Sequence, residues 1–215
     1  MTRPKSCVWI HQHINDPYVK QAQKDGYRSR AAYKIKEIQE KHKLIKPGMT
    51  VLDLGAAPGS WSALVVNWVG KKGKVFALDL LPIDPISGVE CLQGDIQDPV
   101  IAADLKDRMA GEMADVVLSD IAPNISGNSS VDASRSAYLW DMALEVANDF
   151  LKEGGVFCIK VFQGAGFDAY VKKLRQQYAT VQIYKPKASR SRSSEVYLIA
   201  KQKRAAEPST NGVTS

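Results

Sequence analysis

From Lys46 onward, short apolar runs typical of strands alternate with segments of helical spacing, and no other feature constrains the fold as strongly. The predicted strands cover residues 47–55, 74–80, 89–95, 114–120 and 154–162, followed by a terminal pair at 180–186 and 193–202. The predicted helices between them cover residues 60–70, 98–110, 132–152 and 166–178. Strands that alternate with helices pair in parallel within one sheet. The sequence therefore predicts an α/β fold: a mostly parallel central sheet with helices on both faces, a C-terminal antiparallel strand, and ligands at the carboxyl ends of the strands.

The residues before Lys46 do not follow this alternation. Apolar side chains recur near helical spacing at Ala32, Ile35 and Ile38, and Ser29 precedes them as a plausible N-cap. At the other end, the last eleven residues have a composition typical of disorder. We therefore expect three parts: a helical N-terminal segment over residues 1–45, one domain over 46–204, and a disordered tail over 205–215.

Positive charge is concentrated near the N-terminus. The first 50 residues contain 11 Lys and Arg against 4 Asp and Glu, whereas the other 165 contain 18 against 19. A second basic cluster, KPKASRSRS, begins at Lys185. Charge of one sign gathered in one part of a chain favours a polyanionic partner, with nucleic acid as the first candidate. A solvated, lysine-rich helix face is the alternative, and we expect residues 1–45 to face RNA.

Composition argues against several other classes of protein. Apolar residues make up 45% and charged residues 24% of the chain, as in ordinary globular proteins. We expect no membrane span, which needs roughly 20 apolar residues in a row, and no secretory signal. The cysteines, Cys7, Cys91 and Cys158, are widely spaced and lie in no metal-binding pattern. They indicate reduced thiols, and we expect a cytoplasmic monomer without a metal.

The sharpest single motif is VLDLGAAPGSW, residues 51–61, in which a buried strand runs into a glycine-rich turn before a helix. Glycines in such a turn let the backbone approach a ligand closely. The turn GAAPG is not the GxGxxG of dinucleotide-binding proteins, and Pro58 lacks an N–H that a diphosphate could use. The motif therefore argues against a nicotinamide-dependent dehydrogenase and favours a nucleoside with a smaller, zwitterionic tail.

Carboxylates end the next two predicted strands. Asp79 is well placed to accept hydrogen bonds from ribose hydroxyls, and Asp95 could hold an adenine amino group. In the first strand, Asp53 is expected either close to the ligand or organising its loop. Each of these residues alone could be a turn or capping residue. Three carboxylates behind one glycine-rich turn point to S-adenosylmethionine as the cofactor.

Two further strands carry charged side chains near their ends. The run SDIAPN contains Asp120, and EGGVFCIKVFQG contains Lys160 in the middle of an apolar strand. An unpaired ammonium group is costly in such surroundings, unless its stem packs there and its head reaches water. The pattern alone leaves open whether Lys160 is a packed surface lysine or a functional group.

With these motifs, the chain resembles the FtsJ/RrmJ-type RNA ribose 2′-O-methyltransferases over residues 18–201. Four residues match the K-D-K-E tetrad of that family in order and spacing: Lys34 in RAAYKIKEI, Asp120 in SDIAPN, Lys160 in FCIKVFQG and Glu195 in RSSEVYLIA. The resemblance implies a Rossmann-like, S-adenosylmethionine-dependent methyltransferase fold. The compact chain is similar to the bacterial heat-shock members, which implies methylation of a uridine 2′-oxygen in large-subunit ribosomal RNA, on the assembled subunit.

The resemblance also implies roles for individual residues. The tetrad would be catalytic, and cofactor contacts would come from Gly59, Trp61, Asp79, Asp95 and Asp120. Burial and a second ammonium nearby favour the neutral form of an amine. Lys160 would therefore act as the base, or as the group that steers the lone pair of the 2′-oxygen. Asp120 would orient Lys160, and Lys34 with Glu195 would complete the substrate side.

Other functions compete with this prediction. The motifs do not separate ribosomal RNA from transfer RNA or a capped messenger end, although the chain length favours ribosomal RNA. A non-catalytic RNA-binding module is disfavoured because all four tetrad residues are present. A small-molecule methyltransferase is disfavoured by the basic first 50 residues and by the lack of an evident lid domain.

Overall fold

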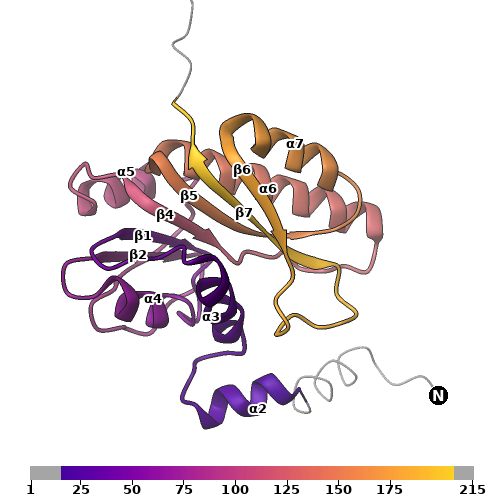
Figure 1. Ribbon diagram of the computed structural model, residues 1–215, viewed down its shortest axis with the longest axis horizontal. Coiled ribbons are helices and arrows are strands. Elements are labelled where there is room, and N and C mark those ends of the chain that lie inside the picture. Colours follow the sequence, from indigo (N-terminus) through magenta and orange to yellow (C-terminus); the bar gives the residue numbers. More distant parts are fainter. Residues whose placement is uncertain (1–15, 206–215) are drawn as a thin grey trace, which may run out of the picture.

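The computed structural model describes residues 16–205; Cys7 and nearly all of the predicted tail lie outside the described residues. Seven strands form one sheet in the order β3-β2-β1-β4-β5-β7-β6 (Figure 1). The strands are β1 (Thr50–Leu54), β2 (Lys74–Asp79), β3 (Glu90–Gln93), β4 (Ala114–Ser119), β5 (Leu151–Phe162), β6 (Tyr178–Tyr184) and β7 (Glu195–Lys203). β1 to β5 pair in parallel, and β7 runs antiparallel between β5 and β6. The predicted sheet and its antiparallel C-terminal strand are confirmed.

Helices cover both faces of this sheet (Figure 1). The described helices are α2 (Pro17–Lys24), α3 (Ala31–His42), α4 (Ser62–Val69), α5 (Pro99–Arg108), α6 (Ser129–Phe150) and α7 (Phe167–Gln177). α3 and α4 pack on one face, whereas α5, α6 and α7 pack on the other. In the part of the chain that the structure describes, no helix has the length and apolarity to cross a membrane.

Each face of the sheet has its own apolar core. The core under α5, α6 and α7 includes Trp140, Phe157 and Leu174, and the core under α3 and α4 includes Ile35 and Ile38. Both isoleucines are fully buried. Burial of such side chains stabilises a fold by about 1.5–3 kcal/mol each. α3 falls within the predicted N-terminal segment, yet this packing joins it to the sheet and fixes where its polar residues lie.

The helix predicted from residue 29 is confirmed as α3, but Ser29 is not its N-cap. Arg30 occupies the cap position and makes no side-chain capping hydrogen bond. The Ser29 hydroxyl instead shares a hydrogen bond of 2.7 Å with the Ser60 hydroxyl and accepts the N–H of Ala31. The Ser29 hydroxyl therefore serves both the first N–H group of α3 and a contact with the glycine-rich turn.

Side-chain caps set the start of three other helices. Asp98 caps α5 with Pro99 at the first position, as the sequence predicts. Asn128 caps α6, which begins at Ser129 rather than at residue 132. The alternation pattern does not predict α2, although Asp16 caps it and a proline follows. This Asp-Pro pair is the same start signal that identifies α5.

Candidate active site

The carboxyl ends of three neighbouring parallel strands, β1, β2 and β4, meet at one edge of the sheet. The register pairs Leu54 with both Leu78 and Ser119, so the ends of β1, β2 and β4 are level. The turn after β1, Asp79 at the end of β2 and Asp120 just after β4 therefore lie at the same edge. The strand order reverses between β1 and β4, which is where open α/β sheets bind ligands.

The glycine-rich turn needs a glycine at residue 59 because of its backbone conformation. This residue has a φ of +93°, and an added Cβ would lie 2.6 Å from Cδ1 of Ile86 and 3.1 Å from Nη1 of Arg28. A positive φ is strained for any residue with a Cβ. Gly59, predicted to contact the cofactor, is therefore required by the backbone of the turn itself.

The start of α3 holds this turn in place. The Arg28 guanidinium donates hydrogen bonds to the carbonyl oxygens of Pro58 at 2.8 Å, Asp84 at 2.8 Å and Pro85 at 3.0 Å. The indole N–H of Trp61 donates to the Ala31 carbonyl oxygen at 2.9 Å. Together with the contact between Ser29 and Ser60, these bonds join residues 28–31 to residues 58–61. Trp61 is 2% exposed, so its predicted cofactor contact remains a prediction.

The two carboxylates predicted to bind the nucleoside lie at the same edge. Asp79 accepts the backbone N–H of Ala57 at 2.9 Å and that of Leu81 at 2.8 Å, one on each oxygen. Asp95 is exposed and accepts the N–H of Gln97 at 3.0 Å on Oδ1. An ionised carboxylate offers about four acceptor sites, so both residues retain capacity for hydroxyl or amino donors of a ligand.

Asp53 is the most deeply buried carboxyl group of the site. Its Oδ2 accepts the Ser62 hydroxyl at 2.6 Å, while its Oδ1 is buried without a partner. Its pKa is raised to about 7, chiefly by burial and also by the nearby Asp120 and Asp79 carboxylates, while hydrogen bonds from Ser62 act against this rise. A buried acceptor without a partner costs about 1–3 kcal/mol, so this position favours a cationic or hydrogen-bond-donating ligand.

The chemistry of this edge fits S-adenosylmethionine. The Arg28 guanidinium there is already bound to three carbonyl oxygens. The carboxylates of Asp79, Asp95 and Asp120 repel a diphosphate but accept hydrogen bonds from ribose hydroxyls and amino groups. They also favour the positive charge of a sulfonium and an ammonium group. Asp79 and Asp95 would hold the nucleoside, the tight turn at Gly59 would approach it, and Asp120 would lie on the methyl side.

Lys160 does not carry an unpaired charge. Its side chain is 7% exposed and its Nζ lies 3.1 Å from Oδ1 of Asp120 and 2.5 Å from the Asp120 carbonyl oxygen. A carboxylate and a carbonyl oxygen both stabilise an ammonium group. The packed-lysine alternative, in which the head reaches water, is wrong because the ammonium group is held inside the site.

The second lysine of the tetrad forms a parallel pair. Lys34 from α3 contacts Oε1 of Glu195 at 2.7 Å, with side chains 11% and 12% exposed. The Ser189 hydroxyl donates to the same oxygen at 2.8 Å. The structure thus brings all four predicted tetrad residues to one edge as two ion pairs.

Tyr197 lies between the two ion pairs. It pairs with Lys160 across β5 and β7, and its hydroxyl donates to Oδ1 of Asp120 at 2.6 Å. Lys34 Nζ lies 5.8 Å from the centre of its ring. Burial alone would raise the pKa of Asp120, but the Lys160 and Lys34 ammonium groups and the tyrosine hydroxyl outweigh it and lower this pKa. Asp120 is therefore an anion at neutral pH.

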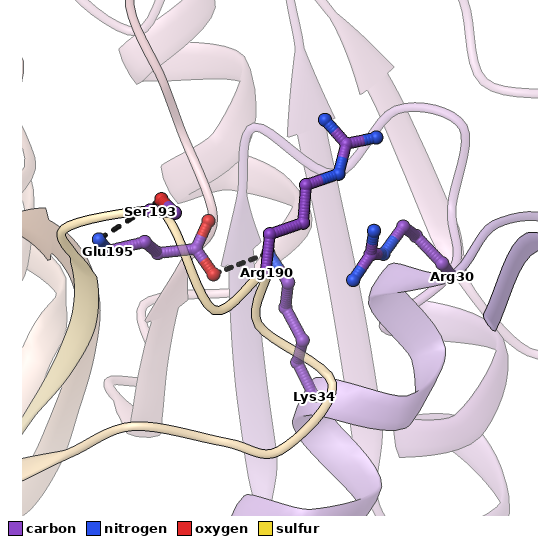
Figure 2. A pocket seen from close by; sticks show the side chains of 5 residues that line it. All are labelled: Arg30, Lys34, Arg190, Ser193 and Glu195. Atoms are coloured by element: carbon purple, nitrogen blue, oxygen red, sulfur yellow. Dashed lines mark hydrogen bonds and ion pairs between the residues drawn. The ribbon is translucent and has the colours of Figure 1, made fainter. Parts of the chain in front are cut away.

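A cationic cavity of about 190 Å³ opens beside the second pair (Figure 2). Its lining residues are Arg30, Lys34, Arg190, Ser193 and Glu195. Arg30 and Arg190 share the Asp16 carboxylate, and Nε of Arg30 is buried without a partner. Burial and the neighbouring Arg190 both lower the pKa of Arg30. Two guanidinium groups that share one carboxylate favour a further anion in this cavity.

Four residues that contact the site are not predicted by the sequence analysis. They are Arg28, Ser189, Arg190 and Tyr197. Ser189 and Arg190 lie in the basic cluster that begins at Lys185, which indicates nucleic acid but no individual contact. Tyr197 follows Glu195 by two residues in a strand and so shares its face. That spacing is a usable signal for Tyr197, whereas nothing local to Arg28 indicates its three carbonyl partners.

Comparison with known proteins shows the family to which the chain is similar. The family model of the FtsJ-like methyltransferases matches residues 27–203. A protein of Azoarcus sp. (strain BH72) named ribosomal RNA large subunit methyltransferase E is 52% identical over 194 residues, covering 90% of this chain and 95% of that protein. The protein of the same name from Chromobacterium violaceum is 51% identical over 205 residues, covering 95% of this chain and 100% of that protein.

Solved structures agree with the fold. A crystal structure from Plasmodium falciparum described as a ribosomal RNA methyltransferase has a TM-score of 0.74 and 28% identity, covering 84% of this chain and 100% of that chain. Aeropyrum pernix fibrillarin, crystallised with S-adenosyl-L-methionine, has a TM-score of 0.53 and 16% identity, covering 81% of this chain and 75% of that chain. The fibrillarin likeness concerns the fold alone. From the family model and the relatives that are about half identical, the chain belongs to the FtsJ-like methyltransferases.

Proposed function

We propose that the protein transfers a methyl group from S-adenosylmethionine to the ribose 2′-oxygen of a uridine in large-subunit ribosomal RNA. The observation that carries this proposal is the pair of buried ion pairs, Lys160 with Asp120 and Lys34 with Glu195, beside the cofactor edge. The named function of the relatives supports the choice of ribosomal RNA. We further propose that a monomer acts in the cytoplasm on the assembled subunit.

The tetrad residues position the oxygen that is methylated. S-adenosylmethionine supplies an electrophilic methyl group, so the chain's own task is to hold the 2′-hydroxyl in line with it. Asp120 holds the Nζ group of Lys160 in place, and this group donates a hydrogen bond to the 2′-oxygen and steers its lone pair. As the new O–C bond would form, the bond between the methyl carbon and sulfur would break and the donor would leave as a neutral thioether. The hydroxyl would then become strongly acidic, so its proton would pass to water without a strong base.

The cationic cavity supports an RNA substrate. Its guanidinium groups, from Arg30 and Arg190, suit the oxygens of a phosphate. Glu195 lines this cavity and also pairs with Lys34, so a phosphate bound there lies next to the tetrad. In an RNA strand, a backbone phosphate is only a few bonds from the ribose 2′-oxygen. We therefore assign the cavity to a phosphate of the reacting or adjacent nucleotide.

Replacement of Lys160 tests the proposed function. Lys160→Ala is expected to lower the rate of methyl transfer to large ribosomal subunits by roughly 100-fold to 10,000-fold, because the 2′-oxygen loses the group that aligns it. Binding of S-adenosylmethionine should stay nearly unchanged, as measured by calorimetry. Rates would be measured as radiolabelled methyl incorporated into subunits from cells that lack the protein.

Lys173→Ala is the matched control for this experiment. Lys173 also forms an ion pair, with Asp141 at 2.7 Å, but both side chains are about half exposed. This variant should retain the wild-type rate. Wild-type activity in Lys160→Ala would contradict the proposed mechanism, and loss of activity in both variants would point to a loss of stability instead.

A further inference from the structure

A second cavity, of about 500 Å³, is lined by Phe162 and Ser194, which are close in sequence to Lys160 and Glu195 of the tetrad. It is formed by the first turns of α6, the end of β5 and the loop that follows β5. The residues that matter here are Ala133, Ser136, Trp140, Phe162, Gln163 and Ser194. Phe162 follows Lys160 by two residues in β5 and pairs with Glu195 of β7. The wall of this cavity is therefore built on the same strand ends that carry the tetrad.

Residues 193–195 separate the two cavities, because neighbouring residues of this segment line different cavities. Ser193 and Glu195 line the cationic cavity, whereas Ser194 lines the second one. The carbonyl oxygen of Ser194 accepts the backbone N–H of Gln163 at 3.0 Å, which holds this partition against the end of β5. A ligand group held at the tetrad thus lies beside the cationic cavity, which Lys34 and Glu195 line, and the second cavity begins at the neighbouring Phe162 and Ser194.

The two cavities differ in chemical character. Asp132 is the one charged residue among the described residues that line the second cavity. Its carboxylate is already used by the backbone N–H groups of Ser126 and Gly127, at 2.8 and 3.0 Å, and by the Ser126 hydroxyl. What remains is aromatic, aliphatic and uncharged polar surface, which suits a flat, neutral, hydrogen-bonding group rather than a phosphate.

Contacts with Tyr170 fix the position of Trp140, which lines the second cavity. Trp140 is 3% exposed, its ring lies 5.5 Å from the ring of Tyr170, and its carbonyl oxygen accepts the Tyr170 hydroxyl at 2.8 Å. Phe162 packs against the same core but is only half-buried. Gln163 and Ser194 at the rim carry side chains that both donate and accept hydrogen bonds. Aromatic surface next to such groups is the combination that proteins use to hold an unstacked base.

We propose that this second cavity binds the base of the nucleotide whose ribose is methylated. The proposal rests on the proposed function, because it requires a ribose at the tetrad. A ribose carries a phosphate on one side and a base on the other. The cationic cavity and the neutral, aromatic cavity present these two chemistries beside the tetrad. The target nucleotide is then turned out of its stack, with its base against Phe162 and its polar edge facing Gln163 and Ser194.

Three variants test the proposal. Ala133→Trp fills the cavity, Phe162→Leu removes the aromatic face while keeping apolar bulk, and Gln163→Ala removes a polar group that is exposed and so unimportant for folding. Ala169→Trp is the matched control, because Ala169 is exposed on α7 and does not line the cavity. Large subunits from cells that lack the protein serve as substrate. The measured quantities are KM for the subunit, kcat, and S-adenosylmethionine affinity.

Loss of base binding predicts a specific pattern. KM for the subunit should rise roughly tenfold or more in Ala133→Trp and about fivefold in Phe162→Leu, with a smaller rise in Gln163→Ala. S-adenosylmethionine affinity and the Ala169→Trp control should match the wild type. Should Ala133→Trp fail to fold, the other two variants decide.

Two results would overturn the proposal. One is a wild-type KM in the folded cavity variants. The other is an equal loss of S-adenosylmethionine affinity in Phe162→Leu and Gln163→Ala, which would mean that these residues act on the cofactor rather than on a base. Failure of the proposed function gives a different result, because the wild-type protein itself would then not methylate the subunit.

Discussion

At the scale of single residues, the ionisation of Asp53 at the cofactor edge makes the stability of the fold depend on pH. Its pKa of about 7 in the folded protein lies above the ordinary value of 3.8. The folded state therefore holds a proton that the unfolded state has lost between these two values. Its effect on stability is absent at lower pH, becomes increasingly unfavourable as pH rises from about 4 to about 7, and is constant above that range.

Asp53→Asn should remove this pH dependence. Without added ligand, the free energy of unfolding of the wild type should fall by up to a few kcal/mol between about pH 4 and pH 8 relative to that of the variant. Asparagine is uncharged at every pH and still accepts the Ser62 hydroxyl. Urea unfolding of both proteins across this range measures the difference. Parallel curves for the two proteins would show that Asp53 is ionised in the folded state throughout.

The tetrad was predictable at this scale, but its internal connections were not. The resemblance to the FtsJ-type family supplies the tetrad, whereas the apolar strand around Lys160 alone leaves its role open. The hydroxyl of Tyr197 reaches Asp120 only because β7 inserts beside β5 in one particular register. Strand order and register depend on packing across the whole sheet, so local patterns do not contain them.

At the scale of elements, residues 28–34 connect the two halves of the site. Arg28, Ser29 and Ala31 contact the glycine-rich turn. From the same segment, Arg30 donates to the Ala188 carbonyl oxygen, and Lys34 contacts Glu195. A single helix start therefore holds both the cofactor turn and the loop that lines the cationic cavity.

Arg28→Ala should loosen the cofactor turn. Loss of its hydrogen bonds to Pro58, Asp84 and Pro85 should weaken S-adenosylmethionine binding roughly tenfold, since a hydrogen bond from a charged group contributes about 1.5–3 kcal/mol and this side chain is partly solvated. Calorimetry measures the dissociation constant. Lys24→Ala, which removes a charge from the same region, is the control. Unchanged cofactor affinity together with weaker RNA binding would assign Arg28 to the RNA instead.

Most elements follow from sequence periodicity, and the exceptions have physical reasons. β5 begins at Leu151 rather than at residue 154, and an irregular pairing with β4 between Ala114 and Val116 accompanies this early start. α2 escapes the pattern because it buries only Ala22, so it lacks the apolar stripe by which longer helices are recognised.

At the scale of the whole molecule, opposite charges occupy the two sides of one edge. Carboxylates gather around the cofactor turn, where Arg28 is bound to carbonyl oxygens, and the guanidinium groups of Arg30 and Arg190 gather beside Glu195. The sequence predicts both charges, since the acidic strand ends and the basic segments are visible in it. It does not predict that the Arg28 and Arg30 side chains donate hydrogen bonds to carbonyl oxygens of this same chain. Both residues belong to the basic N-terminal run, and their partners lie far along the chain.

The most direct measurement of the central claim is the position of the transferred methyl group. Wild-type protein would be incubated with labelled S-adenosylmethionine and either unmethylated large subunits or bulk transfer RNA, and the RNA would be digested to nucleosides and identified by mass spectrometry. The label is expected in 2′-O-methyluridine from large-subunit ribosomal RNA. Label only in transfer RNA, or on a base atom, would contradict the account.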